Sequence, residues 1–488
     1  MKVATNAFWL SFCRVLADLL SFVLFAVISR TFGPTGTGEY SYAFAVGTLI
    51  ALISTSGFED YGIRQYARTA VSERAALWQD MLSTQCAQLG LGLLAFWVFV
   101  LAGAIHAGNL LVVIELSIYV IGWSASRTFF IPAMASQSMV RPAFTDLSCR
   151  LAAILGALLW ALLGHPPLAL LLVGFPIAGI TLCVLSLRNA AGHGASLRPG
   201  RTLHGIVRTV RGTLPFAGSD ILNQFYARAD VLLIAYFLGS AKVGLYSTDI
   251  KFVEVGLLPL ILLGTASYPL LSGHAARNAP QFEPAAQDFI RVVFFFAGWL
   301  ALGIYWLIPL LIVPLFGARF APAVPLLPYI AAFALMKGGE AAFYRLLYSV
   351  HRQNLYCWSL LAGTAIIWSL NYLLIPKFGL VGAVVAAILS TLVIDVICIA
   401  GLARHIKPRF IALTGGRLVL ALGLAALLVE GARKLGAGPW TMALAACMVF
   451  PLFCGALGLL PHPRRSHLLK PPGSTDPFDG GSPPIKAN

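Results

Sequence analysis

Long blocks of apolar residues, separated by short polar connections, run through almost the whole chain. A helix needs about 20 mostly apolar residues to cross about 30 Å of hydrocarbon. Fourteen blocks reach this length, so the pattern predicts an all-α polytopic membrane protein with about fourteen transmembrane helices. The blocks cover approximately residues 7–29, 41–58, 82–104, 110–131, 143–164, 167–187, 213–238, 246–272, 290–315, 323–348, 355–375, 379–403, 412–430 and 440–460.

The composition agrees with a membrane protein and excludes a large soluble domain. Of the 488 residues, 59% are hydrophobic and 11% are charged, and the mean hydropathy is +0.83. A soluble domain carries about 25% charged residues. The first apolar block is too long for a signal peptide, and Arg14 and Asp18 interrupt it. We therefore expect it to remain as the first transmembrane helix.

The distribution of basic residues predicts the orientation in the membrane. With an even number of crossings, both termini lie on the same side. Of the 34 Lys and Arg residues, 21 lie in connections or tails on that side and six on the other. Because cytoplasmic connections are enriched in Lys and Arg, both termini are predicted to be cytoplasmic. This asymmetry also explains most of the net charge of +15 without a nucleic-acid partner.

Cofactor and metal chemistry find little support in the sequence. The eight Cys residues are scattered through apolar segments without a C-x-x-C pair, and the nine His residues lie in connections or at the ends of blocks. We therefore predict no metal site and no cofactor. No connection is long enough for a large catalytic loop, so the chain is not predicted to be an enzyme.

One short connection has the glycine spacing of a phosphate-binding loop. Gly33 and Gly38 match G-x-x-x-x-G, but a P-loop continues with Lys and then Ser or Thr. Here Glu39 and Tyr40 follow, so neither the ammonium nor the magnesium-binding hydroxyl is present. The glycines are better explained as a turn between two helices that requires positive φ.

The same connection reveals an internal repeat. Residues 33–41 and 239–247 share Gly, Gly, Tyr and Ser at four of nine positions. The offset of 206 residues contains six predicted helices, so the two copies run in the same direction. The sequence therefore predicts two parallel six-helix lobes followed by two further helices and a disordered cytoplasmic tail. The corresponding segments are 1–200, 201–404, 405–460 and 461–488.

Ionisable residues within the predicted helices are the candidate functional residues. Placing one at the centre of a bilayer costs about 2.5–3.5 kcal/mol on insertion scales, and such residues usually face a polar interior. The basic candidates, predicted to contact an anionic substrate, are Arg14, Arg228, Lys251, Lys337 and Arg345. The acidic candidates, predicted to balance these charges or to bind a coupling proton or sodium ion, are Asp18, Asp220, Asp230, Glu254 and Glu340.

The spacing of these charges allows a structural interpretation as well. Arg14 and Asp18 share one helix face, and the first helix of the second lobe carries a polar stripe at matching depth. Two such helices would line a central cavity or lock the lobes together. Three acid–base pairs have helical spacing: Lys251–Glu254, Lys337–Glu340 and Asp146–Arg150. Each pair could neutralise itself and fasten helices, and for the last pair, near a membrane surface, fastening is the favoured interpretation.

Several short motifs, in order along residues 5–404, resemble one family of membrane carriers. They are Phe8-Trp-Leu10, Arg14-Val-Leu16, Ile28-Ser-Arg-Thr-Phe-Gly33, Gly38-x-Tyr-Ser41, Phe237-Leu-Gly239, Val243-Gly-x-Tyr246, Asn371-Tyr-Leu-Leu-Ile-Pro376 and Phe378-Gly-Leu-Val-Gly-Ala383. The pattern is similar to that of bacterial polysaccharide-transport (Wzx-like) flippases. Their superfamily also contains the lipid II flippases and the multidrug extruders.

The resemblance implies a bacterial inner-membrane carrier that works by alternating access. Its family moves undecaprenyl-pyrophosphate-linked oligosaccharides, the repeat units of O-antigen, capsule or exopolysaccharide, to the external leaflet. The implied partners are this glycolipid, the lipid bilayer, a polysaccharide polymerase, a chain-length regulator, and a coupling proton or sodium ion.

The resemblance leaves alternatives open. Lipid II flippases also have Arg-Val-Leu at Arg14 but carry a second Arg six residues later, where this chain has Leu20. Asp18 keeps an ion-coupled multidrug antiporter in consideration, although such extruders usually have twelve helices. A membrane polysaccharide polymerase or ligase and a purely structural membrane protein are further alternatives.

Overall fold

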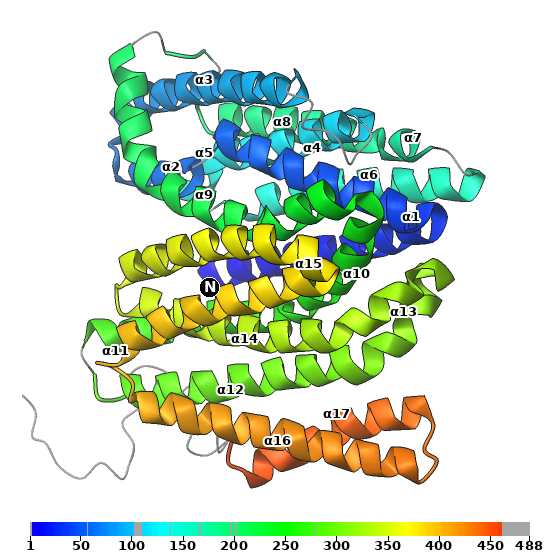
Figure 1. Cartoon of the computed structure of the whole chain (residues 1–488). Helices are drawn as coiled ribbons and strands as arrows, with labels where there is room; N and C mark the ends of the chain where they lie inside the picture. Colours follow the sequence, from blue (N-terminus) through cyan, green and yellow to red (C-terminus); the bar gives the residue numbers. More distant parts are fainter. Residues whose placement is uncertain are drawn as a thin grey trace, which may run out of the picture.

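The computed structural model describes residues 2–55, 57–101, 110–136, 138–164, 167–195, 198–200, 203–277 and 279–460, and within them every regular element is a helix (Figure 1). The predicted tail, 461–488, lies outside the described residues. The elements are α1 (Lys2–Thr55), α2 (Phe58–Arg68), η1 (Val71–Glu73), α3 (Arg74–Leu101), α4 (Leu110–Phe129), α5 (Ile131–Ala135), α6 (Val140–Leu163), α7 (Leu168–Leu172), α8 (Gly174–Gly192), α9 (Leu203–Leu238), α10 (Ser240–Gly256), α11 (Leu258–Ala276), α12 (Phe282–Leu302), η2 (Gly303–Leu307), α13 (Ile308–Phe316), η3 (Ala318–Leu326), α14 (Leu327–Ser349), α15 (Gln353–Leu402), α16 (Pro408–Lys434) and α17 (Pro439–Ala456).

The membrane crossings agree with the expectation from hydropathy. The described residues contain 12 helical segments that are long and apolar enough to cross a membrane. Two of them, within α1 and α15, have 44 and 50 residues, about twice the length that one crossing needs. Both are interrupted, at Gly33 and at Gly379, and Figure 1 shows α15 folding back on itself. Each of these two therefore supplies two crossings, and the prediction of an all-α protein with about fourteen is confirmed.

Glycines with positive φ mark four turns between helices. Gly33, Gly239, Gly317 and Gly379 have φ values of 67°, 81°, 99° and 59°. A side chain would be strained in this region, so only glycine adopts it readily. The interpretation of Gly33 and Gly239 as turn residues, and not as parts of a phosphate loop, is confirmed. We call the end of the molecule that carries these four residues the glycine end.

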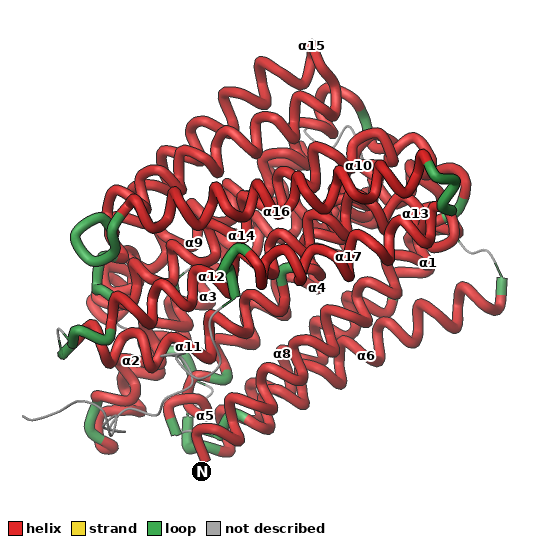
Figure 2. Tube along the Cα trace, turned by 90° about the horizontal axis from the view of Figure 1, so that it is seen from below, coloured by secondary structure: helices red, strands yellow, loops and turns green. Residues whose placement is uncertain are grey.

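The helices pack into two bundles. In the first bundle α1 packs on α3, α4 and α6, and α8 packs on α4 and α6. In the second, α15 packs on α9 and α14, and α12 packs on α14. Figure 1 shows α16 and α17 beside α12, at the side farthest from the first bundle. In Figure 2 the connections gather at the two ends of the molecule.

The two bundles meet along α1 and α10, and again at the beginning of α9. On both sides of Gly33, α1 lies against α10, and the beginning of α9 lies against α3 and the start of α2 in the first bundle. Arg208, near the start of α9, forms an ion pair of 2.9 Å with Asp80 of α3. The chain after residue 200 therefore starts on the first bundle and then crosses to the second.

Candidate functional site

Charged side chains from four helices meet between the two bundles. Asp18 of α1 lies within electrostatic range of Arg14, of Arg150 on α6, and of Lys251 and Glu254 on α10. We call this group the central charge cluster. Its members are Arg14, Asp18, Asp146, Arg150, Arg228, Lys251 and Glu254.

Local packing turns the charged face of α1 towards this cluster. Cys13 and Ala17 are buried against Ala143 and Leu147 of α6. Residues one position further along a helix point about 100° away, so Arg14 and Asp18 project beside this contact and not into it. Arg14 is exposed and Asp18 is partly buried.

Lys251 and Glu254 form the ion pair expected from their spacing. The Lys251 Nζ lies 2.7 Å from a carboxylate oxygen of Glu254 and 5.8 Å from the centre of the Phe25 ring. Half of the Glu254 side chain is exposed, against 27% of Lys251. The charge of this lysine is therefore largely balanced within its own helix.

Arg228 is in a different situation. Its guanidinium lies 5.3 Å from the centre of the Phe44 ring, and its Nε is buried without a hydrogen-bond partner in the described residues. Glu254 is within electrostatic range, but no carboxylate oxygen of the described residues lies at ion-pair distance from Arg228. Arg228 thus contributes to the central charge cluster a positive charge that has no ion-pair partner among the described residues.

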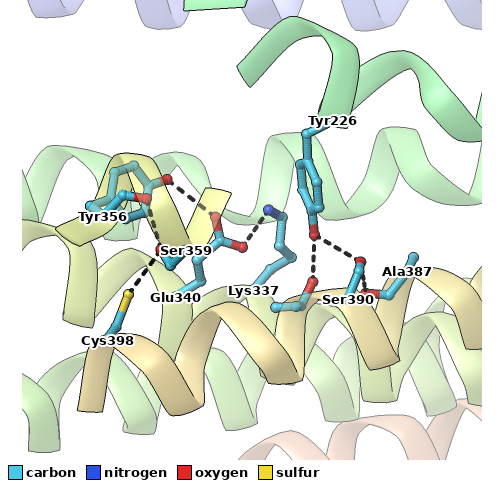
Figure 3. Close-up of polar contacts among 9 residues, drawn as sticks. Tyr226, Lys337, Glu340, Tyr356, Ser359, Ala387, Ser390 and Cys398 are labelled. Atoms are coloured by element: carbon cyan, nitrogen blue, oxygen red, sulfur yellow. Dashed lines mark hydrogen bonds and ion pairs between the residues drawn. The ribbon is translucent and has the colours of Figure 1, made fainter. Parts of the chain in front are cut away.

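A second polar cluster lies inside the second bundle (Figure 3). Lys337 and Glu340 of α14 form an ion pair of 2.6 Å, and the Lys337 Nζ lies 4.8 Å from the centre of the Tyr226 ring. The hydroxyl of Tyr356 donates to the other Glu340 oxygen at 3.4 Å. Tyr226 is hydrogen-bonded in turn to Thr391 at 2.8 Å. These contacts hold Lys337 within the second bundle. The sequence alone did not distinguish it from the basic residues of the central charge cluster.

Asp230 joins three helices of the same bundle. One carboxylate oxygen accepts a hydrogen bond of 2.6 Å from the amide of Asn371 on α15, and the other accepts a hydrogen bond from the hydroxyl of Tyr246 on α10. Lys337 lies within electrostatic range. Asp230, Lys337 and Glu340 therefore belong to one polar group, which we call the second polar cluster together with Tyr226, Tyr246, Tyr356, Asn371 and Thr391.

Two predicted site residues lie outside both clusters. Asp220 is exposed, and its carboxylate accepts a hydrogen bond of 3.1 Å from the backbone N–H of Gly57, just before α2. Arg345 is held by aromatic rings, with its guanidinium 5.0 Å from Tyr344 and 5.7 Å from Tyr268. The structure thus brings five of the ten predicted residues together in the central charge cluster and three in the second polar cluster.

Four residues of interest were not among the candidate functional residues predicted from the sequence. Arg150 joins the central charge cluster although its position near a membrane surface favoured a purely structural pair. Asp249, Glu115 and Asp395 are buried acids with relative exposures of 0%, 6% and 6%, and each has at least one carboxylate oxygen without a hydrogen-bond partner in the described residues. The signal that could have found the three acids is a single carboxyl inside a long apolar block.

Comparisons with known proteins agree with this architecture. A family model described as "polysaccharide biosynthesis protein" matches residues 3–274, more than half of the chain. No curated protein matches the chain in sequence. The fold resembles that of the lipid II flippase MurJ in an inward closed conformation, with a TM-score of 0.71 and 13% identity, over 92% of this chain and 98% of that one.

Two multidrug transporters have the same fold. A MATE family transporter of the MOP superfamily, in an inward-facing conformation, matches with a TM-score of 0.59 and 12% identity, over 79% of this chain and 95% of that one. The MATE multidrug transporter DinF-BH, in a ligand complex, matches with a TM-score of 0.56 and 14% identity, over 83% and 95%. At these identities the likeness establishes the fold alone.

Proposed function

Since the chain belongs to the polysaccharide biosynthesis protein family, we propose that it is a flippase for undecaprenyl-pyrophosphate-linked oligosaccharide. Its multi-pass fold is that of flippases and exporters, and the resemblance expected from the sequence motifs is confirmed at the level of the family. In this proposal the protein lies in a bacterial inner membrane with both termini in the cytoplasm. The cargo is the repeat unit of O-antigen, capsule or exopolysaccharide.

The observation that carries the proposal is the positive charge of Arg228, which has no ion-pair partner among the described residues. The central charge cluster contains four basic and three acidic side chains, and Arg228 has no carboxylate at ion-pair distance in the described residues. An unpaired charge is costly inside a membrane, where ionisable groups usually serve a substrate or an ion. A guanidinium offers a planar fork of donors that matches a phosphate, so a pyrophosphate is a fitting partner.

The remaining groups of the central charge cluster would shape the cavity around this anion. Arg14 is exposed on α1, and we propose that it contacts the same headgroup from the first bundle. Lys251 can turn from Glu254 to the substrate, because half of the Glu254 side chain is already exposed. Asp18 and Glu254 then prevent the empty cavity from accumulating excess positive charge.

We assign the acids of the second polar cluster to coupling. Asp230 and Glu340 lie close to Lys337, so a proton or sodium ion arriving there would change the balance of charges inside the second bundle. The lobes, 1–200 and 201–404, would then rock about their contact along α1 and α10. The prenyl tail stays in lipid during this movement, and the polymerase and chain-length regulator receive the product outside.

The test compares single substitutions at Arg228 and Arg14 with a matched arginine elsewhere. Arg228→Ala and Arg14→Ala are scored for polysaccharide output at equal membrane abundance, and Arg228→Lys tests the need for a fork of donors. Loss of one charge-assisted contact should lower the transport rate by about tenfold or more. The control is Arg433→Ala, because Arg433 is 64% exposed and pairs with Glu430 on α16. Wild-type output from both Ala variants at the cluster would refute the anion cavity.

A multidrug or cation antiporter is the second candidate, because Asp18 lies in the central charge cluster. It would need acidic groups to dominate that cluster, whereas basic groups outnumber acidic ones by four to three. Overexpression that raises drug resistance, with Asp18→Asn abolishing the effect and Arg228→Ala leaving it intact, would favour the antiporter.

A further inference from the structure

We infer that Arg150 is an additional oxyanion contact of the substrate cavity, clamped in place by Asp146 and Trp123. The inference rests on the proposed function, because it names one more residue for the pyrophosphate group. It assigns a binding role to a side chain whose sequence position suggested only a helix fastener. We call Arg150, Asp146 and Trp123 the Arg150 clamp.

The first observation is the way in which Asp146 holds the guanidinium. The Arg150 Nε lies 3.2 Å from one oxygen of Asp146 and 3.1 Å from the other. This leaves the two terminal nitrogens, with four N–H donors, free of hydrogen bonds to the described residues. Neither terminal nitrogen is among the fully enclosed unpartnered atoms, in contrast to the Nε of Arg228 and of Arg345. The terminal nitrogens are therefore not fully enclosed, although the side chain as a whole is only 16% exposed.

The second observation is the position of this guanidinium over an indole ring. The Arg150 Cζ lies 4.7 Å from the centre of the Trp123 ring. The ring contact and the carboxylate together restrict the guanidinium before any ligand arrives. A donor fork that is already ordered loses less conformational entropy when it binds an oxyanion.

The third observation is the position of the clamp. Arg150 lies within electrostatic range of Asp18 in the central charge cluster. It approaches from α6 of the first bundle, whereas Arg228 and Lys251 approach from α9 and α10 of the second. A headgroup with two linked phosphates carries anionic oxygens in more than one direction, so it can use arginines from both bundles.

A neighbouring arginine shows why Arg150 is distinct. Arg127 lies over the same indole ring, at 5.7 Å from its centre, but its Nη2 is 2.5 Å from a carboxylate oxygen of Glu59. The carboxylate of Glu59 therefore occupies a terminal donor of Arg127, whereas Asp146 occupies only the Nε of Arg150. Arg127 is the matched control, because it shares the ring and the charge but uses a terminal nitrogen for its own ion pair.

The experiment measures binding of inorganic pyrophosphate to the purified full-length protein by calorimetry. Inorganic phosphate is the second probe, and distinguishes a diphosphate site from a general anion site. We expect Arg150→Ala and Arg150→Lys to weaken pyrophosphate binding by about tenfold or more, because each removes the fork of donors. Arg127→Ala should bind pyrophosphate like the wild type. Because Arg150→Lys keeps a positive charge beside Asp146, it tests the fork even if Arg150→Ala folds poorly.

Trp123 is a positioning residue, and its test separates positioning from folding. Trp123→Phe keeps an aromatic face and should retain most of the pyrophosphate affinity, whereas Trp123→Leu should lose it without a matching drop in the melting temperature of the empty protein. Equal losses in affinity and melting temperature would show that the ring is only structural.

The outcomes distinguish this inference from the proposed function. If Arg228→Ala loses pyrophosphate binding and Arg150→Lys binds like the wild type, the role of Arg150 is refuted and the flippase proposal stands. If the wild type binds no pyrophosphate and both Arg228→Ala and Arg150→Lys keep full polysaccharide output, both proposals fall. If Arg127→Ala and Arg150→Ala weaken pyrophosphate binding equally, the effect is one of nonspecific charge, and the role of the Arg150 clamp is refuted.

Discussion

Gly38 of α1 lies directly against the backbone of Ser240 at the start of α10. A methyl group built on Gly38 would come within 1.7 Å of the Ser240 carbonyl oxygen. The relationship is reciprocal, since a methyl group on Gly244 would lie 1.9 Å from the carbonyl oxygen of Pro34. Pro34 and Ser240 occupy matching positions of the repeat, as do Gly38 and Gly244. The two copies of the repeat therefore close on each other at the glycine end, with no room for a side chain between them.

Substitution of either glycine by Ala should force the two bundles apart at this crossing. Overpacking of a tight contact costs about 1–3 kcal/mol, so Gly38→Ala and Gly244→Ala should each lower the melting temperature of the purified protein. Once one methyl group has separated the helices, the second should cost less, so the double variant should be less destabilised than the sum of the two. Gly423→Ala in α16 is the control, because no atom lies within 4 Å of its added methyl group. Unchanged melting temperatures for Gly38→Ala and Gly244→Ala would contradict the close contact between α1 and α10.

The pair Lys337–Glu340 should behave as a buried ion pair. Removing one partner leaves an unpaired charge and should cost about 3–5 kcal/mol, whereas replacing both by apolar residues is often neutral. We therefore expect Lys337→Met and Glu340→Leu each to lower the melting temperature strongly, and the double variant to recover it. The exposed pair Arg433–Glu430 is the control, since breaking a surface pair costs about 0–1 kcal/mol.

Polysaccharide output from that double variant then decides the role of the pair. If the recovered protein transports normally, Lys337 and Glu340 only fasten α14 within the second bundle. The substrate contact predicted for Lys337 and the coupling role proposed for Glu340 are then wrong. Recovered stability without transport supports a functional role.

Asp230 should depend on both of its hydrogen-bond donors. In Asp230→Asn one of the two accepting oxygens becomes an amide N–H₂, so either the Asn371 amide or the Tyr246 hydroxyl loses its acceptor. An unsatisfied buried group costs about 1–3 kcal/mol, so thermal unfolding should show a clear loss. Tyr246→Phe removes one donor and leaves one Asp230 oxygen without a partner, so it should cause a loss of similar size.

Coupling by sodium at Asp230 makes a separate prediction. Ligands that bind only the folded state raise its melting temperature, so sodium should raise that of the wild type more than that of Asp230→Asn. An equal response to sodium in both proteins would remove Asp230 from ion binding and leave its structural role unaffected.

Acidification should destabilise the connection between α15 and α16 through His405. Burial, with Arg352 and Arg404 nearby, lowers the pKa of His405 below its ordinary value, and its Nδ1 is buried without a partner in the described residues. The unfolded state then binds the proton more readily than the folded state. The stability linked to this group is complete above the ordinary pKa of about 6.5 and is lost as the pH falls below it.

The pH experiment compares the wild type with His405→Asn. Melting temperatures measured from about pH 8 to about pH 5 should fall more steeply for the wild type, because the variant lacks the titrating ring. Parallel curves would show that proton uptake by His405 does not contribute to the pH dependence of the melting temperature. The comparison between the two proteins cancels the titration of other groups.

The sequence by itself determined the features that depend on near neighbours along the chain. Blocks of about 20 apolar residues predict the crossings because a helix of fixed rise must span a fixed thickness. The turn glycines at Gly33 and Gly239 follow from a local backbone requirement. The pairs Lys251–Glu254 and Lys337–Glu340 follow from helical spacing, since residues three or four apart share a face.

Only the tertiary structure decided which of these local features meet. Helical spacing places Lys337 and Lys251 in equivalent pairs, yet packing puts Lys337 inside the second bundle beside Tyr226 and Lys251 near Asp18 between the bundles. Asp220 was predicted to line the cavity, and the structure places it at Gly57 before α2. Hydropathy indicates how deep a residue lies in the membrane. The direction in which its side chain points around the helix axis depends on contacts with residues far apart in the sequence. Those contacts exist only once the bundles have packed.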